Sequence, residues 1–554
     1  MKKMNKLLAL VLAMVMVLGL ATTAFAATVN VPSDGILKDH TFTAYQIFSG
    51  REEDGILSDV NWGTGINDSA FLAALKADTT YGSLFNSCTD AAAVAKVLGD
   101  NNTNAALANA VAKLAYANKT GSGTALTSGT TELADGYYLV EDTTANVGQG
   151  GAYNASLLQV VGAVNITVKT DAPTVEKKVL ENVKYSQDDG YGTGYNDVAD
   201  YNMGDTVTFH LIGVVPDMSR YDTYKYIFHD TMSAGLTFNK DSVKVYVAED
   251  KEGTNKTDIT GKWTVGDGKE GETFTVSCDD IKSIEGVSKG NYIIVEYTAT
   301  LNQNAEVGLD GNPNVVYLEY SNKPDQSGSG DTNNTGKTPE DRVIVFTYEL
   351  DTTKISGTEY TKAPDGTAPE KVDEDGYLLD DDGNKIPLKL QGAEFKLHNA
   401  DNKWAIVDGN NKVTGWSDTE EGGSKLTSGA NGLFTVIGLD DGTYYLKETK
   451  APTGYNLLSS EITVVITATT TNGQTWTDGD ASKALTALAV KADNKDGTGN
   501  TSTGVASITV ANNKGSTLPE TGGIGTTIFY VLGGMLVVCA VVLMVSKKRM
   551  SAEG

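Results

Sequence analysis

The chain has 554 residues and is strongly acidic, with 71 Asp and Glu residues against 44 Lys and Arg residues and a formal net charge of −27. Such a surface excludes nucleic acid as a natural partner, because the phosphate backbone would repel it. The length suits about three or four domains. Only 3 cysteines are present, so we expect a covalent brace other than the disulfides that stabilise many secreted proteins.

The first 26 residues are predicted to be a secretory signal peptide. Three lysines precede an apolar stretch at residues 7–20, and Ala24-Phe25-Ala26 offers a small-x-small cleavage site. This order is typical of a secretion signal. The mature chain is therefore expected to begin at about Ala27 and to lie outside the cell.

The mature chain reads as a series of β-sandwiches. Short alternating segments rich in Thr, Val, Tyr and Gly are separated by frequent turns, which is typical of this architecture. We predict an all-β protein of three tandem Ig-like domains, with a minor helical part at about 70–76 and 91–117. The predicted domains are residues 27–171, 172–325 and 340–515, with a linker at 326–339.

An acidic run lies inside the predicted third domain. Asp373-Glu374-Asp375 and Asp380-Asp381-Asp382 sit beside Gly376 and Gly383. We interpret this run as a solvated hairpin. A calcium loop is the alternative, because oxygen ligands are dense there, but the spacing fits no defined motif. The sequence predicts no metal and no cofactor.

The C-terminus has three parts in a fixed order. The pentapeptide Leu518-Pro519-Glu520-Thr521-Gly522 is followed by an apolar run at 524–545 and by Lys547, Lys548 and Arg549. About 20 apolar residues suffice to cross a bilayer, and basic residues keep their end of a span in the cytoplasm. Residues 516–554 are thus predicted to be a cell-wall sorting signal that a sortase cuts between Thr521 and Gly522. The alternative is an ordinary single-span anchor.

Each predicted domain carries motifs of one known family. Residues 444–455 (YYLKETKAPTGY) match its E-box, and Gln391-Gly392-Ala393-Glu394-Phe395 matches the GAxF strand of CnaB-type domains. Tyr201–Val207 and His229–Met232 are similar to its CnaA-like middle domain, and Thr43–Phe48 and Gly136–Glu141 to its N-terminal domain. The whole precursor resembles a Gram-positive backbone pilin of the isopeptide-forming SpaA type. The resemblance implies a structural shaft subunit of a covalently polymerised surface pilus, with a role in adhesion and colonisation.

The resemblance also implies intramolecular Lys–Asn isopeptide bonds, each promoted by a nearby carboxyl group. Side chains two positions apart on a strand share a face, which allows an independent choice of residues. In the second domain Lys177 falls on the apolar face of its strand, whereas Lys178 falls on the polar face. Asn322 and Asp230 each continue an alternating apolar series. The predicted set is therefore Lys177, Asn322 and Asp230.

The third domain offers a second set. Lys354 shares a face with Tyr348, Leu350 and Thr352, and Asn512 follows Ile508 and Val510 at the same parity. Glu448 of the E-box follows Tyr444 and Leu446. We predict a bond between Lys354 and Asn512, promoted by Glu448, with Asn513 as the alternative asparagine.

The chemistry requires burial. A buried lysine loses its hydration, so its pKa falls from about 10.4 and the neutral amine becomes a nucleophile. A buried carboxyl stays protonated and can polarise the Asn carbonyl. Attack on Cγ releases ammonia once per domain, so the protein is not expected to be an enzyme. The opening strand of the first domain, 41–48, has no lysine, and although Glu141 fits the acid position, no bond is predicted there.

Polymerisation requires an exposed lysine, which the family places at the end of its first domain. In the strand 164–169, three apolar residues share the buried face, so Lys169 is expected to face solvent. The Tyr-Pro that usually precedes the family's acceptor is missing, and Lys177, Lys178 or a distant lysine remain alternatives. With both bonds in place, tension between Lys169 and Thr521 would bypass both sandwiches.

The resemblance implies class C pilus sortases and housekeeping sortases as partners, together with further copies of the chain, accessory pilins, peptidoglycan and host ligands. The competing function is a wall-anchored adhesin, or an accessory pilin at tip or base, that is never polymerised. A hydrolase is disfavoured, because the four histidines are scattered and no nucleophile elbow or HExxH pattern is present.

Overall fold

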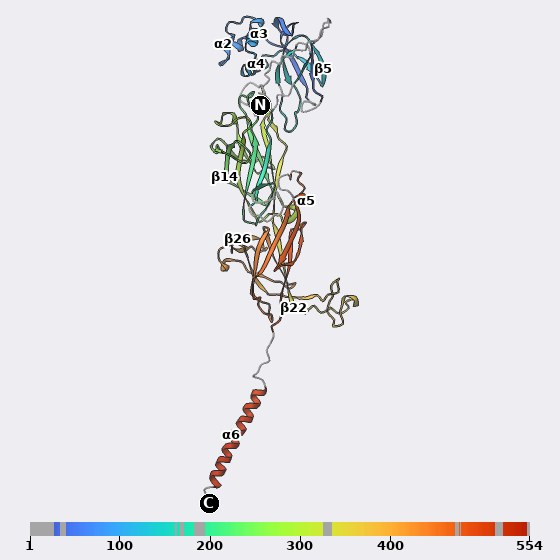
Figure 1. The fold of residues 1–554 in the computed structure, drawn as a ribbon, viewed down its shortest axis with the longest axis vertical. Helices are drawn as coiled ribbons and strands as arrows, with labels where there is room; N and C mark the ends of the chain where they lie inside the picture. The colour runs from blue at the N-terminus through green and yellow to red at the C-terminus, as the bar shows by residue number, and fades with distance from the viewer. Residues whose placement is uncertain are drawn as a thin grey trace, which may run out of the picture.

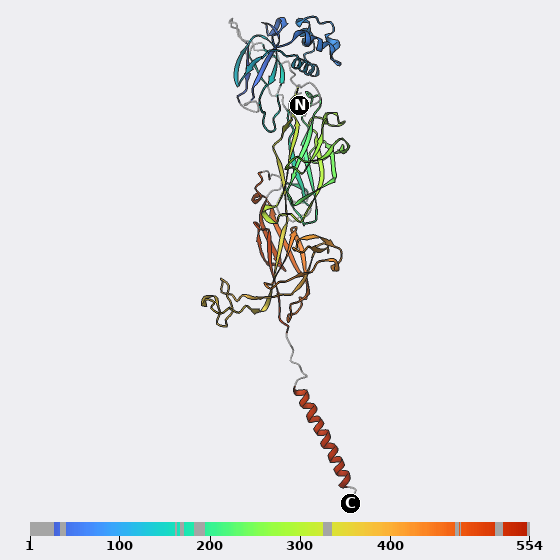
Figure 2. The ribbon, with the colours of Figure 1, turned by 180° about the vertical axis from the view of Figure 1, so that it is seen from behind.

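The computed structural model is elongated, with three β-rich bodies stacked along its long axis and a long helix at the C-terminal end (Figures 1 and 2). We call them the N-terminal, middle and C-terminal bodies. The structure describes residues 27–33, 40–153, 155–160, 163–166, 171–181, 194–324, 335–470, 476, 478–515 and 524–550. The predicted signal peptide, Lys169 and the pentapeptide 518–522 lie outside these residues.

The N-terminal body combines two small sheets, with strand orders β5-β1-β8 and β3-β2-β6-β7, and four helices. Its strands are β1 (Ala27–Val31), β2 (Phe42–Glu53), β3 (Ile56–Trp62), β4 (Thr124–Leu126), β5 (Gly129–Leu133), β6 (Gly136–Asp142), β7 (Ala155–Val160) and β8 (Ala163–Asn165). Its helices are α1 (Asp68–Ala77), α2 (Gly82–Phe85), α3 (Ala91–Asp100) and α4 (Ala105–Ala117).

Side-chain caps set the start of three of these helices. The side chains of Asn67, Asp90 and Asn104 accept hydrogen bonds from the backbone amides of residues 70, 93 and 107, which satisfies donors that a helix start leaves unpaired. The cap at Asn104 divides the stretch predicted as helical at 91–117 into α3 and α4.

The middle body is a sandwich of two sheets, with strand orders β10-β9-β12-β18-β14-β15 and β11-β21-β19-β13-β17-β16. Its strands are β9 (Val175–Glu181), β10 (Gly194–Asn196), β11 (Val198–Asp200), β12 (Thr206–Val214), β13 (Tyr226–Met232), β14 (Leu236–Ala248), β15 (Thr257–Asp258), β16 (Thr264–Asp267), β17 (Phe274–Cys278), β18 (Tyr292–Leu301), β19 (Asn312–Ser321), β20 (Thr335–Lys337) and β21 (Asp341–Phe346).

The C-terminal body is a second sandwich, with strand orders β23-β22-β34-β33 and β26-β25-β24-β29-β30-β31-β32. Its elements are β22 (Tyr348–Tyr360), β23 (Pro387–Lys389), β24 (Glu394–Asn399), β25 (Trp404–Val407), β26 (Val413–Ser417), β27 (Leu426–Thr427), β28 (Leu433–Leu439), β29 (Gly442–Lys450), β30 (Ile462–Thr470), α5 (Ala481–Ala484), β31 (Leu485–Ala492), β32 (Lys495–Asp496), β33 (Thr498–Asn500) and β34 (Val505–Asn512). The mostly β architecture predicted from the sequence is confirmed.

The acidic run belongs to an arm, residues 361–386, that projects sideways between β22 and β23 (Figure 1). Lys385 forms ion pairs with Asp373 at 2.6 Å and with Asp375 at 3.2 Å, and Lys371 pairs with Asp381 at 2.7 Å. Lysines therefore already neutralise part of this run.

The boundary between the middle and C-terminal bodies differs from the predicted one. Strand β21 lies between β11 and β19 in the middle body, and only the buried Thr347 separates it from β22. The polar break at 326–339 therefore falls between strands of one sandwich. It misled the prediction because its polar composition resembles that of a linker between domains, although the continuous apolar run 343–346 that follows it belongs to the middle body. The buried side chains of both bodies form one continuous apolar cluster.

The last described element is α6 (Ile524–Met550), whose side chains from residue 528 to residue 549 are exposed. Its segment Ile528–Arg549 has 22 residues and a mean hydropathy of 2.8. This helix is long and apolar enough to cross a membrane, and its last turn carries Lys547, Lys548 and Arg549.

A pair of truncations tests the position of the boundary. A chain that ends at residue 346 should keep a cooperatively folded middle body, whereas one that ends at residue 339 should lose it. The shorter chain lacks Val343, Ile344, Val345 and Phe346, all at most 2% exposed. Burial of each is worth about 1.5–3 kcal/mol, and their sum rivals the roughly 5–15 kcal/mol stability of a domain. Thermal unfolding followed by circular dichroism measures the difference, and equal unfolding curves would contradict this boundary.

Candidate functional site

Lys354, Asn512 and Glu448 meet inside the C-terminal body. Strands β22 and β34 run parallel and pair Ser356 with Asn512, while β29 brings Glu448 from the opposite sheet. The three residues are 0%, 1% and 6% exposed. Lys354 Nζ donates to Asn512 Oδ1 and lies 3.5 Å from Glu448 Oε1. Asn512 Nδ2 donates to both carboxylate oxygens, at 2.9 and 3.0 Å.

The loop after the E-box strand holds this group in place. Asn512 Nδ2 also donates to the carbonyl of Asn456 at 2.9 Å, and the backbone amide of Leu458 donates to Glu448 Oε2 at 2.8 Å. Burial lowers the pKa of Lys354 to about 8, against the opposing attraction of Glu448. A substantial fraction of the amine is thus neutral near physiological pH. The alternative asparagine, Asn513, is exposed.

A second buried lysine lies in the middle body. Lys177 Nζ donates to Asp230 Oδ2 and, at 2.9 Å, to the hydroxyl of Tyr297, which itself donates to Asp230 Oδ2 at 2.8 Å. The three side chains are at most 1% exposed. Burial lowers the pKa of Lys177 and raises the pKa of Asp230, although each charge partly offsets the shift of the other.

The asparagine beside this pair is Asn314, not the predicted Asn322. Asn314 is fully buried, and its Nδ2 donates to the Tyr297 hydroxyl at 2.9 Å. Asn322 lies at the other end of β19, where its backbone carbonyl accepts from Tyr153 of the N-terminal body at 2.8 Å. Both asparagines share the inward face, so parity alone could not separate them. The register of strand pairing separates them. Asn314 pairs with Met232, two residues after Asp230, and so lies close to the acid along the strand.

Sequence reasoning also missed Tyr297. This residue lies on β18 among the inward-facing residues Ile293, Val295, Ala299 and Leu301. An aromatic hydroxyl on a buried face must find polar partners, and that requirement is the signal that could have identified it.

The two lysines next to the predicted acceptor are both occupied. Lys177 is fully buried, and Lys178 Nζ donates to Asp197 Oδ1 at 2.6 Å with only 12% of its side chain exposed. Neither presents a free amine to a large enzyme.

The N-terminal body arranges its acid differently. Glu141 accepts a hydrogen bond from Tyr116 at 3.1 Å and pairs with Lys119. Lys119 follows α4 rather than lying on the opening strand, and its side chain is 24% exposed, so water reaches this pair in a way that it does not reach Lys177 or Lys354.

The histidines form no common site among the described residues. His40 pairs with Asp142, His210 with Glu296, and His398 with Glu461. His229 lies between Glu272 and Glu319, at 2.9 and 3.1 Å. Each ring nitrogen thus serves local packing of its own body.

Two segments match known families. Residues 375–480 match the SpaA family, described as a prealbumin-like fold domain. Residues 511–551 match the LPXTG cell wall anchor motif. Together with α6, the second match confirms that this is a cell-wall-anchored surface protein of the Gram-positive type.

The chain is also similar to streptococcal surface proteins. It is 24% identical over 409 residues to the trypsin-resistant surface T6 protein of Streptococcus pyogenes serotype M6, and the match spans 63% of this chain and 65% of that relative. Among solved structures, the group B streptococcus pilus 2b backbone protein is 26% identical, with 58% of this chain and 97% of that chain covered and a TM-score of 0.37. The T6 backbone pilin is 18% identical, with 89% and 100% covered and a TM-score of 0.49. The SpaA-type domain and the LPXTG anchor expected from the sequence are confirmed by the two family matches.

Proposed function

We propose that this chain, with its SpaA-type prealbumin-like domain and LPXTG anchor, is the structural shaft subunit of a covalently polymerised surface pilus. The observation that carries the proposal is that two successive sandwiches each hold a fully buried lysine in contact with an acid. Both sandwiches precede the wall anchor in the chain. A shaft must bear tension, and covalent bonds across its domains suit that task.

In the C-terminal body, we assign the bond to Lys354 and Asn512. The neutral amine attacks Cγ of Asn512, a new N–C bond forms, and the amide nitrogen leaves as ammonia. Glu448 contacts that nitrogen rather than the carbonyl oxygen. It is therefore placed to carry the proton from the attacking amine to the leaving group. The carboxyl ends in the form in which it began.

In the middle body, we assign the bond to Lys177 and Asn314 and the acid role to Asp230. The Tyr297 hydroxyl contacts all three side chains. It can pass the proton between Asp230 and the amide while it holds the amine in place. Since Lys177 lies in one sheet and Asn314 in the other, this bond ties the two sheets of the sandwich together.

With Asn314 in place of Asn322 as the partner of Lys177, tension takes a different path through the chain. The Lys354–Asn512 bond closes a loop of 158 residues, and chain-entropy arguments give such a loop roughly 4–5 kcal/mol of stabilisation. In the middle body, however, the chain leaves Asn314, runs up β19 and returns down β21 before it reaches the C-terminal body. The β19–β21 hairpin therefore stays in the load path, where its ladder is pulled along the strand direction.

Polymerisation completes the proposal. A sortase would cleave after Thr521 and join its carbonyl to Lys169 of another copy of the chain. The partners are then a pilus sortase of class C, a housekeeping sortase that transfers the polymer to peptidoglycan, and accessory pilins. Host ligands would follow from the family's role in colonisation.

Intact mass tests the two bonds. The processed chain should lack two ammonia molecules relative to its encoded mass. Asn314→Ala and Asn512→Ala should each restore one, because each removes an electrophile. Asn322→Ala is the matched control and should leave the mass deficit at two. A deficit that falls to one ammonia molecule with Asn322→Ala, and stays at two with Asn314→Ala, would contradict the assignment to Asn314.

The rate of bond formation in the C-terminal body should depend on pH. The pKa of Lys354 is lowered to about 8, so the neutral fraction of the amine rises with pH up to that value. Below it, the rate should fall about tenfold per pH unit. Chain that has not yet cross-linked can be refolded at pH 6, 7 and 8 and followed by peptide mass mapping of the 354–512 bond. A faster reaction at pH 6 would refute the neutral amine as the nucleophile.

Polymerisation is tested on denaturing gels of wall extracts. The wild-type chain should give a high-molecular-weight ladder, and Lys169→Ala should collapse it to the monomer band. Lys178→Ala is the control, because Lys178 is engaged with Asp197. A single wall-linked band from the wild-type chain would favour the adhesin function and reject the shaft.

A further inference from the structure

A group of buried carboxylates lies where the middle body meets the C-terminal body. Asp200 ends β11 of the middle body, and Asp440 and Asp441 form the turn between β28 and β29 of the C-terminal body. These residues are 2%, 3% and 7% exposed. One carboxylate oxygen from each lies within 4.8 Å of the other two. Three acids from two bodies thus converge on one point.

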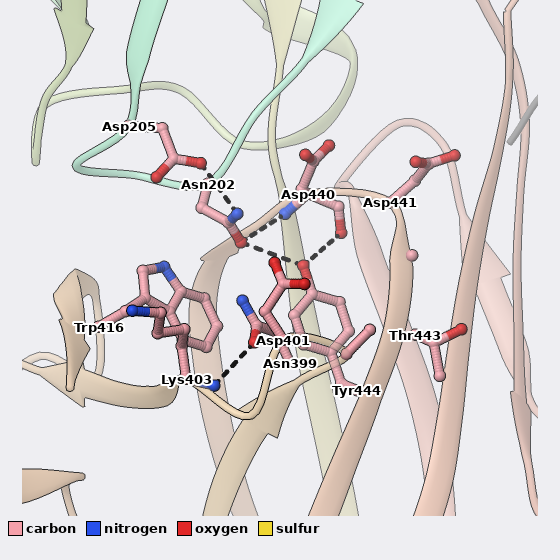
Figure 3. Close-up of a pocket in the computed structure, with 12 residues that line it drawn as sticks. Asn202, Asp205, Asn399, Asp401, Lys403, Trp416, Asp440, Asp441, Thr443 and Tyr444 are labelled. Atoms are coloured by element: carbon pink, nitrogen blue, oxygen red, sulfur yellow. Dashed lines mark hydrogen bonds between the residues drawn. The ribbon is translucent and has the colours of Figure 1, made fainter. Parts of the chain in front are cut away.

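The turn that carries two of these acids is fixed by the middle body. The Asp440 backbone amide donates to Asn202 Oδ1 at 3.1 Å, and the hydroxyl of Tyr444 donates to the same oxygen at 3.0 Å (Figure 3). Asp200 Oδ2 accepts from the Tyr348 hydroxyl at 3.0 Å. Hydrogen bonds with neutral groups therefore fix the turn at Asp440 and orient the carboxylate of Asp200.

One of the acids has an unused oxygen. Asp440 Oδ1 is buried and has no hydrogen-bond partner among the described residues. A buried carboxylate oxygen without a partner costs free energy.

The spacing suits a hard divalent cation. Calcium binds oxygen ligands at about 2.3–2.6 Å, so two ligands on opposite sides of the ion lie roughly 4.6–5.2 Å apart. The residues that line an adjoining hollow of about 450 Å³ include Asp440, Asp441, Asp205 and one lysine, Lys403 (Figure 3). Water in this hollow can complete the six to eight oxygen ligands that calcium takes.

We propose that Asp200, Asp440 and Asp441 bind one calcium ion at the junction of the middle and C-terminal bodies. The ion takes ligands from both bodies and so fixes their relative orientation. The site differs from the acidic arm at 361–386, whose exposed acids are paired with lysines. It is independent of the cross-links and of polymerisation, and it adds a stiffening element that responds to calcium outside the cell.

Calcium titration of the full chain in detergent, after removal of metals with EDTA, tests the site. One equivalent of CaCl₂ should bind by isothermal titration calorimetry, with a dissociation constant of about 10⁻⁴–10⁻³ M, as in other extracellular calcium modules. The unfolding temperature should rise on addition of CaCl₂. The double variant Asp440→Asn/Asp441→Asn should lose both responses. The matched control Asp381→Asn/Asp382→Asn removes the same charge from the arm and should keep them.

A spectroscopic measurement covers the case in which the double variant fails to fold. Terbium bound at the site would lie near Tyr348 and Tyr444, so excitation of tyrosine should give terbium luminescence that CaCl₂ displaces. Absence of calcium binding and of sensitised luminescence in the wild-type chain would overturn the proposal. So would a control variant in the arm that loses the calcium response while the junction variant keeps it.

Discussion

The structure depends on two ammonium groups placed where water cannot reach them. Lys177 and Lys354 are both fully buried, and a buried charge is expensive even when an opposite charge is in contact with it. A buried ion pair is therefore a poor reason to keep a lysine in a sandwich core. Conversion of the amine and an amide into an isopeptide removes the charge permanently and replaces it with a neutral bond. The arrangement makes physical sense as the precursor of a covalent link.

The polar atoms around Lys177 support this view. Asp230 Oδ1 and Asn314 Oδ1 are buried without a hydrogen-bond partner, a condition that well-packed interiors avoid. Aromatic rings enclose the amine, with Phe209 and Tyr297 within 6 Å of it. They keep water out and leave the carboxyl and the amide as the polar groups within reach. In the N-terminal body, by contrast, the Lys119–Glu141 pair is partly open to water.

The sequence predicted the faces of the strands better than positions along them. Alternation with period two placed Lys177, Lys354, Asn512 and Asp230 on buried faces. The structure brings these residues together in two pairs, Lys177 with Asp230 and Lys354 with Asn512. Alternation cannot say how far along a face a residue lies. Asn314 and Asn322 are equivalent by that measure, and only the pairing of β13 with β19 separates them. For the same reason, the sequence did not assign β21 to the middle body. A polar loop between two strands of one sandwich has the same composition as a linker between two sandwiches.

The junction between the middle and C-terminal bodies and the junction between the N-terminal and middle bodies are built from different contacts. Between the middle and C-terminal bodies, one buried residue joins β21 to β22, the apolar core is continuous, and Met203 donates to the carbonyl of Gly438 at 3.0 Å. Gly308 and Gly504 also approach so closely that an added Cβ on either would lie within 2.5 Å of the other's backbone. These contacts pack the two bodies closely against each other.

At the upper joint, the contacts among the described residues are polar and include an ion pair between Lys113 and Asp222. The backbone amide of Gly150 donates to the carbonyl of Lys337 at 2.8 Å, and the Tyr320 hydroxyl donates to the carbonyl of Gly151 at 2.9 Å. Asn322 belongs to this joint, where its backbone carbonyl accepts a hydrogen bond from the backbone amide of Tyr153. Its side chain faces inward at the end of the sandwich, next to the N-terminal body. The proposed load path begins at Lys169, which follows the last described strand of the N-terminal body in the sequence, so the upper joint is expected to carry no tension. The middle and C-terminal bodies then act as one stiff unit, and the N-terminal body is free to adjust to the neighbouring subunit.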